Sequence, residues 1–179
     1  MADEVLNLTI SRRDVLKALS QVPEDVTGRN ALSDEMLLRI GKVLLKLIRE
    51  SFITKSKGGT DETGIRWAPL QPSTIKRKKK TTRRKRSDIL NDTGELLKSL
   101  TPDSNNKYQI LRISRGKLVI GTNREGAAKH HKGDLSKGIP QRKLWPDVQN
   151  WPESWWEEIL AEVQKGIVDT VVQKLKTLR

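Results

Sequence analysis

The residues best suited to chemistry form a basic run at positions 76–86, where nine of eleven side chains are Lys or Arg and none is acidic. The chain has a net charge of +13, so the run's +9 leaves 13 − 9 = +4 for the remaining residues. A solvated cluster of this kind attracts polyanions. Two interpretations stay open, namely direct contact with phosphates and a disordered, self-repelling loop. The cations concerned, which we expect to face DNA or an acidic partner, are Lys76, Arg77, Lys78, Lys79, Lys80, Arg83, Arg84, Lys85 and Arg86.

The adjacent histidines His130 and His131 are the only two in the chain. Neighbouring side chains point apart on a helix or a strand. No cysteine, HExxH motif or spaced carboxylate set accompanies them. We therefore predict no metal site and no cofactor, and we expect the pair at a surface or an interface.

Catalytic motifs are also missing from the sequence. The glycines Gly116, Gly121 and Gly126 are too scattered for a phosphate-binding loop. No acidic pair that could hold Mg²⁺ lies near the basic run, and no motif positions a Ser, His and Asp together. The sequence therefore indicates a protein that is not an enzyme.

Nucleic-acid readers of the usual kind place aromatic residues among their cations, and the basic run contains none. The run can supply attraction to a phosphate backbone without base readout. Repulsion among the cations of the run, together with its two threonines, argues against an isolated helix at 76–86.

The absence of cysteine excludes a disulfide scaffold. The N-terminus is acidic and lacks the apolar core of a signal peptide. No apolar stretch reaches the roughly 20 residues that span a bilayer. We expect a protein that is made and assembled in a cytoplasm and has no membrane partner.

The N-terminal half predicts one strand and two helices. Alternation over residues 4–10 favours a short strand, and a short helix should follow over 11–22. Ser33 can cap a stronger helix whose wide apolar stripe runs from Met36 to Phe52 and which should end before Gly58. Residues 55–64 are rich in Gly, Thr and Lys and indicate a loop.

Shorter elements are expected in the middle of the chain. The segment 67–70 should be extended because Pro69 disfavours a helical residue before it. Thr93 or Asp92 can cap a short helix. Two strands, over 108–113 and 117–121, should form a hairpin. Residues 126–133 should contain a helical turn that carries both histidines.

The C-terminal region predicts the clearest helix. Apolar residues recur at spacings of three and four after Pro152, over about 25 residues, or roughly 38 Å. Four of the five tryptophans lie between Trp145 and Trp156. This helix either packs inside its own subunit or meets a neighbour with its outer half. We divide the chain into residues 1–145, with a basic loop at 76–86, and residues 146–179, a Trp-rich linker with the C-terminal helix.

Taken together, the segments resemble the phage virion-morphogenesis family of tail-completion and head–tail joining proteins. The resemblance depends on an ordered series of motifs that spans nearly the whole chain. We call them the sequence landmarks: Gly64-x-x-Trp67-x-Pro69-Leu70 with Ser73-Thr74, then Ile89-Leu90-x-x-Thr93-Gly94-x-Leu96, Val119-Ile120-Gly121-Thr122-Asn123, Ala127-x-x-His130-x-x-Gly133 and Ile139-Pro140-x-Arg142.

The chain departs from the family pattern at two places. Gly126 stands where the family usually has a Tyr, and Lys143-Leu144-Trp145 replaces the usual Pro-Phe-Leu. We expect Trp145 to fill the pocket of the missing Phe. The long, Trp-rich C-terminal helix is an addition to the usual pattern.

The resemblance implies an α+β fold, with a small antiparallel β-sheet packed by two long amphipathic helices, long loops and an extended C-terminal helix. It also implies a structural virion protein that forms a ring of six- or twelve-fold symmetry at the head–tail junction and contacts adjacent connector and tail proteins and genomic DNA. The alternative is a basic nucleic-acid-binding protein that uses the run at 76–86. Residues expected at subunit or partner interfaces are Trp67, Leu70, His130, Arg142, Trp145, Trp151, Trp155 and Trp156.

Overall fold

A three-stranded antiparallel sheet forms one layer of the computed structural model, which describes residues 5–12, 15, 33–81, 88–103 and 105–177. The strands are β1 (Leu6–Ser11), β2 (Gln109–Ser114) and β3 (Lys117–Thr122), in the order β1-β3-β2. Ser114 pairs with Lys117, so a two-residue turn joins β2 to β3. Both turn residues, Arg115 and Gly116, have positive φ, as the favoured hairpin turn requires. The three predicted strands are confirmed.

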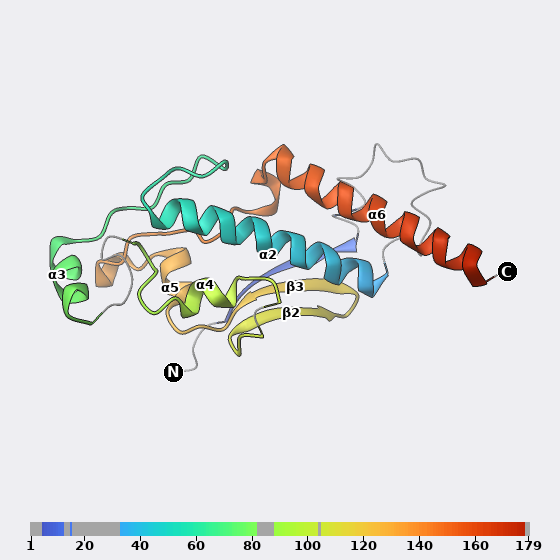
Figure 1. The fold of residues 1–179 in the computed structure, drawn as a ribbon. Helices are drawn as coiled ribbons and strands as arrows, with labels where there is room; N and C mark the ends of the chain where they lie inside the picture. The colour runs from blue at the N-terminus through green and yellow to red at the C-terminus, as the bar shows by residue number, and fades with distance from the viewer. Residues whose placement is uncertain (1–4, 13–14, 16–32, 82–87, 104, 178–179) are drawn as a thin grey trace.

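Helix α2 (Asp34–Ser56) lies across the sheet and forms the centre of the molecule (Figure 1). The Ser33 hydroxyl accepts a hydrogen bond from the Met36 N–H at 3.1 Å, which confirms the predicted N-cap. Gly41 allows the close approach to the sheet, because a Cβ there would lie 2.5 Å from the Leu111 Cδ1. The apolar stripe of α2 is buried and includes Phe52.

Helix α6 (Glu153–Thr177) packs against α2 on the side away from the sheet and continues past the start of α2 (Figure 1). Gly166 lies at the crossing, where a Cβ would collide with the flexible end of Met36. Lys46 pairs with Glu158 at 2.9 Å, and Arg39 pairs with Asp169 at 3.2 Å. The predicted C-terminal helix is therefore confirmed.

Four tryptophans belong to one continuous core together with the sheet and α2. Trp67, Trp145, Trp151 and Trp155 are all buried, with Trp67 2% and Trp155 0% exposed. The region 146–179 thus shares its core with the preceding residues. These four side chains lie inside the subunit, because filling the space between α2, α6 and the loops removes their large apolar surface from water.

Short helices gather at the end of the molecule opposite the C-terminus, with α3 outermost (Figure 1). They are α3 (Pro72–Thr81), α4 (Glu95–Ser99), α5 (Ala127–Lys132) and the 3-10 turn η1 (Leu135–Lys137), while a second 3-10 turn, η2 (Val148–Asn150), precedes α6. Gly94, with φ 81°, is the N-cap residue of α4. The predicted N-cap, Thr93 or Asp92, therefore lies before the observed one, although the Thr93 hydroxyl accepts from the Glu95 N–H at 3.3 Å.

Two details of the expected secondary structure are wrong. Residues 76–81 belong to α3 and are not a loop, because packing of one face of α3 against the body compensates for charge repulsion. Lys55 belongs to the last turn of α2 rather than to the following loop. The α+β class and the hairpin are confirmed, whereas most of the expected helix at 11–22 and residues 82–87 lie outside the described residues.

Candidate functional site

Two regions are candidates for function, a closed charge cluster and an open pocket. The segment 139–145 contributes residues to both. The closed cluster is centred on Lys55, whose side chain is fully buried. Its ammonium forms an ion pair with Asp61 at 3.0 Å and donates to the carbonyl oxygens of Lys143 and Leu144 at 3.2 and 3.3 Å. It also lies 5.3 Å from the centroid of the Trp67 ring. Every donor direction of this cation therefore has a partner.

Asp61 is equally well satisfied. Its carboxylate accepts from the Thr63 and Ile65 N–H groups, both at 3.0 Å, and from the hydroxyls of Thr63 and Ser51. Burial raises the pKa of Asp61, but the hydrogen bonds from Ser51 and Thr63 and the charge of Lys55 outweigh burial and lower it. Burial lowers the pKa of Lys55, and Asp61 opposes that effect. The cluster fixes the loop after α2 to the segment 143–144.

His131 belongs to the same closed region. Its Nδ1 accepts a hydrogen bond from the Leu144 N–H at 3.2 Å, and its ring lies 5.2 Å from that of Trp145. Burial, with the nearby charge of Lys143, lowers the pKa of His131 to about 4. His131 is half-buried, and a neutral ring is needed to accept the Leu144 N–H, so whether the pair lies at an interface stays a prediction.

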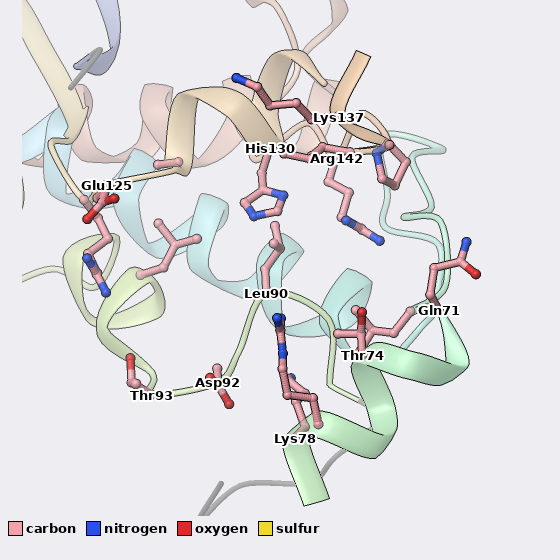
Figure 2. A pocket seen from close by; sticks show the side chains of 18 of the residues that line it. Gln71, Thr74, Lys78, Leu90, Asp92, Thr93, Glu125, His130, Lys137 and Arg142 are labelled. Atoms are coloured by element: carbon pink, nitrogen blue, oxygen red, sulfur yellow. The ribbon is translucent and has the colours of Figure 1, made fainter. Parts of the chain in front are cut away.

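The open pocket has a volume of about 630 Å³. Four of the five sequence landmarks contribute to its walls, although they are spread from residue 70 to residue 142. α3 forms one wall, the segment before α4 forms another, and α5 with residues 137–142 closes the third (Figure 2). Its lining residues that matter here are Leu70, Thr74, Arg77, Lys78, Leu90, Asp92, Leu96, Arg124, Glu125, His130, Lys137, Ile139 and Arg142.

The basic run divides between this pocket and solvent. Thr74, Arg77 and Lys78 line the pocket, a spacing that selects one face of α3. Lys78 is buried and donates to the Asp88 carbonyl oxygen at 2.6 Å, so it is not a solvated cation. Lys76 is exposed on another face. The described part of the run is therefore not one uniform charged surface. It stays a prediction that DNA or a partner contacts Lys76, Lys79, Lys80 and residues 83–86.

The pocket carries five cations against two carboxylates. Lys137 has a partner in Asp134 at 3.4 Å, and Arg124 lies 5.2 Å from the centroid of the Tyr108 ring. Arg142 is buried and holds the Ala68 and Pro69 carbonyl oxygens. Burial lowers its pKa, yet an arginine remains protonated. The arrangement favours an anionic group inside the pocket.

The residues expected at interfaces have different places in the structure. Leu70, His130 and Arg142 line the pocket, and Trp156 is half-buried with its ring 5.0 Å from that of Trp151. The other four tryptophans are core residues, so they are not available to a partner of the folded subunit. Trp67 also donates from Nε1 to the Lys143 carbonyl oxygen at 2.9 Å.

The Lys55–Asp61 pair is missing from the sequence-based site prediction. A signal existed, because Lys55 continues the apolar stripe of α2 at seven residues from Ile48 and three from Phe52. A lysine on a buried face needs a counterion nearby. The following loop contains two neighbouring acids, Asp61 and Glu62, and spacing alone does not show which of them is the counterion.

Among the residues that the structure describes, no group of three or more His, Cys, Asp or Glu side chains is arranged to hold a metal ion. Nor does any helix in the described ranges have the length and apolar character needed to cross a membrane. The side chains that line the pocket offer recognition of charge and of apolar groups.

Comparisons with known proteins place these observations in context. A family model described as the phage virion morphogenesis family matches residues 10–176. No curated protein matches the chain. No solved structure matches it either.

Proposed function

The chain belongs to the phage virion morphogenesis family, and from that premise we propose that it is a structural protein that forms a ring at the head–tail junction. Its role in the virion is structural or in assembly, as the family indicates. In this proposal the ring joins the tail to the DNA-filled head and involves no catalysis. The family match over nearly the whole chain is the observation that carries the proposal.

Exposed apolar residues near opposite ends of the subunit support a ring. Val168 on α6 is 60% exposed, and Leu135 on η1 is 92% exposed. Leu135 lies close to Lys137, which shares the pocket with α3, whereas α6 ends at the other extremity of the molecule (Figure 1). A head-to-tail interface needs two different patches of this kind, and it closes into a ring when the rotation between subunits allows.

The position of α6 provides further support. Its N-terminal half is buried through Trp155, Ile159 and Val163, whereas its later residues extend past α2 (Figure 1). A helix that continues beyond its own core gains stability when a neighbouring subunit covers it. Contacts with adjacent connector and tail proteins would follow at the two faces of the ring.

The test is the mass and shape of the purified protein, by native mass spectrometry and negative-stain electron microscopy. We expect a closed ring for the wild type, and loss of the ring in Val168→Asp with the fold intact by circular dichroism. Asn123→Asp, a change at an exposed position on the sheet side, is the matched control and should leave the ring unchanged. A wild type that stays monomeric alone and with its neighbouring virion proteins would contradict the proposal.

Particles give an independent test of the position. Assembly without this protein should produce DNA-filled heads and finished tails that do not join, visible by electron microscopy. Joined particles in normal number would place the protein elsewhere in the virion.

The alternative function, ordinary nucleic-acid binding, receives support, among the described residues, from the exposed cations Lys76 and Arg77 of α3. It predicts strongly salt-dependent affinity for duplex DNA in the isolated protein, because binding releases counterions. The ring proposal predicts weak affinity of the isolated subunit. Measuring DNA binding of wild type and Lys76→Gln at two salt concentrations separates the two functions.

A further inference from the structure

Arg142 has an unusual environment for a buried cation. The residue is 6% exposed, and its Nε and Nη2 donate to the Ala68 and Pro69 carbonyl oxygens at 3.1 to 3.4 Å. No carboxylate of the described residues forms an ion pair with it, and its Nη1 makes no hydrogen bond with them. A buried charge without a counterion is costly, so an anion that reaches it gains a strong interaction.

His130 presents an unsatisfied group in the same pocket. Its Nδ1 is buried and has no hydrogen-bond partner among the described residues. The Arg142 N–H donates to the His130 carbonyl oxygen at 2.7 Å, which holds the two residues side by side. Figure 2 shows the imidazole and the guanidinium directed into the pocket from the same wall, opposite Thr74 and Lys78.

We propose that this pocket binds an acidic side chain, Asp or Glu, carried by a segment of a neighbouring virion protein. The carboxylate accepts from Arg142 Nη1 and, once the His130 ring has turned toward the pocket, from the Nδ1–H tautomer of His130. Apolar residues that flank the acid in the partner pack against Leu70, Leu90 and Ile139, which also line the pocket. The imidazole nitrogen of His130 then has a hydrogen-bond partner, and the Arg142 cation has its counterion.

The form of the pocket favours a peptide over DNA. Arg142 lies at the wall of a cavity of about 630 Å³, a size that admits side chains. Duplex DNA presents its phosphates on a wide, stiff cylinder and cannot bring one into such a recess. The lining also contains Asp92 and Glu125, whose charges oppose the approach of a polyanion.

This inference depends on the proposed function for the identity of the partner as a virion protein. The binding chemistry of the pocket does not depend on it. The subunit can bind a small acidic peptide whether or not it forms a ring, so the two proposals can fail separately.

The experiment uses the full chain with labelled Ile and Leu methyl groups, observed by NMR, which remains possible for a large assembly. The probe is the peptide acetyl-Leu-Glu-Leu-amide, and the matched control is acetyl-Leu-Gln-Leu-amide. We expect saturable shifts of the Ile139 and Leu90 methyl signals with the Glu peptide, and affinity at least about tenfold lower for the Gln peptide, because a hydrogen bond to a charge is lost. Equal affinities, or no shift of these signals with the Glu peptide, would overturn the proposal.

Variants test the two recognising residues. Arg142→Gln should lower the affinity for the Glu peptide at least about tenfold. Since this variant loses contacts with Ala68 and Pro69, His130→Leu provides a second test that leaves those contacts in place and should also weaken binding. Lys129→Gln, at the exposed neighbour of His130, should bind as the wild type does. Wild-type affinity in His130→Leu and in Arg142→Gln would overturn the proposal.

A short DNA duplex is the last arm of the experiment. It should leave the Ile139 and Leu90 signals unchanged at concentrations where the Glu peptide saturates them. Shifts of these signals with DNA, abolished by Arg142→Gln, would replace the peptide proposal with a nucleic-acid site.

Discussion

The cluster around Lys55 and the pocket around Arg142 are built in similar ways but differ in completeness. Each buries a cation against two backbone carbonyl oxygens, and each joins the segment 61–70 to the segment 142–144. Lys55 also has a carboxylate, Asp61, whereas Arg142 has none among the described residues. The difference teaches that a buried cation with a counterion ties segments of the subunit together, while a buried cation without one, next to a cavity, can accept an anionic group from outside.

The two histidines extend the comparison. His131 is satisfied by the Leu144 N–H on the closed side, whereas His130 Nδ1 is unsatisfied on the pocket side. Residues that are neighbours in sequence thus belong to the two different regions. Variants in each region should have effects that differ in size and in kind.

The largest effect should come from the closed cluster. Lys55→Met leaves Asp61 buried without its cation, so we expect a loss of about 3–5 kcal/mol in the free energy of unfolding. Urea denaturation at neutral pH measures it. Lys57→Met, at an exposed lysine two residues further on, is the control and should change stability by less than about 0.5 kcal/mol.

The double variant Lys55→Met with Asp61→Asn sharpens this result. The amide that replaces the Asp61 carboxylate keeps an oxygen that can accept from Thr63 and Ile65 but carries no charge. The double variant should therefore be less destabilised than the sum of the single variants. Additive losses would mean that the two side chains act independently.

The second effect is a dependence of stability on pH. The unfolded chain protonates His131 near pH 6.5, while in the folded chain its pKa is lowered to about 4. The unfolded state therefore binds more protons between these values, and stability should fall as the pH drops from 6.5 to 4. Solvent screening at the exposed side of the His131 imidazole limits the loss in the free energy of unfolding to about 2 kcal/mol.

His131→Asn tests the assignment by urea denaturation at several pH values. The amide oxygen can still accept the Leu144 N–H but does not titrate in this range, so most of the slope should disappear. The lowered pKa of His130 leaves a smaller slope of the same sign. Asp61 does not contribute in this window, because a lowered carboxyl pKa removes stability only below its ordinary value. An unchanged slope in His131→Asn would contradict the assignment.

A smaller effect is expected for Arg142→Met. The variant loses its hydrogen bonds to Ala68 and Pro69 but also removes an uncompensated buried charge, so we expect a cost of about 1–2 kcal/mol, below that of Lys55→Met. Thermal unfolding with and without acetyl-Leu-Glu-Leu-amide gives a second measurement, in which the peptide stabilises the wild type but not the variant. If Arg142→Met lowered the free energy of unfolding as much as Lys55→Met does, Arg142 would contribute as much to stability as Lys55, and the comparison would fail.

The smallest effect on stability should come from α3. Arg77→Gln and Lys76→Gln alter adjacent exposed cations, of which Arg77 lines the pocket and Lys76 does not. Both should change the free energy of unfolding by less than about 0.5 kcal/mol. Arg77→Gln should weaken binding of the Glu peptide by NMR, and Lys76→Gln should not. If both variants weakened peptide binding equally, the two faces of α3 would not differ in their contact with the bound peptide.

Sequence by itself determined the elements whose signals are local. The Ser33 cap, the apolar stripe of α2, the Arg115–Gly116 turn and the C-terminal helix each depend on residues within a few positions of one another. The order of the sequence landmarks also sufficed for the family. Periodicity, capping and turn preference act over short distances, so they can be inferred without knowing how the chain packs.

Tertiary structure alone decided which side chains are buried and which line the pocket. The sequence suggested tryptophans at interfaces, but the shared core of α2 and α6 buries four of them. It suggested a uniform basic loop, but packing of α3 places Arg77 at the pocket and buries Lys78. The pairing of charge and the burial of residues outside an apolar stripe depend on contacts between segments far apart in the chain, and spacing within one segment does not identify those contacts.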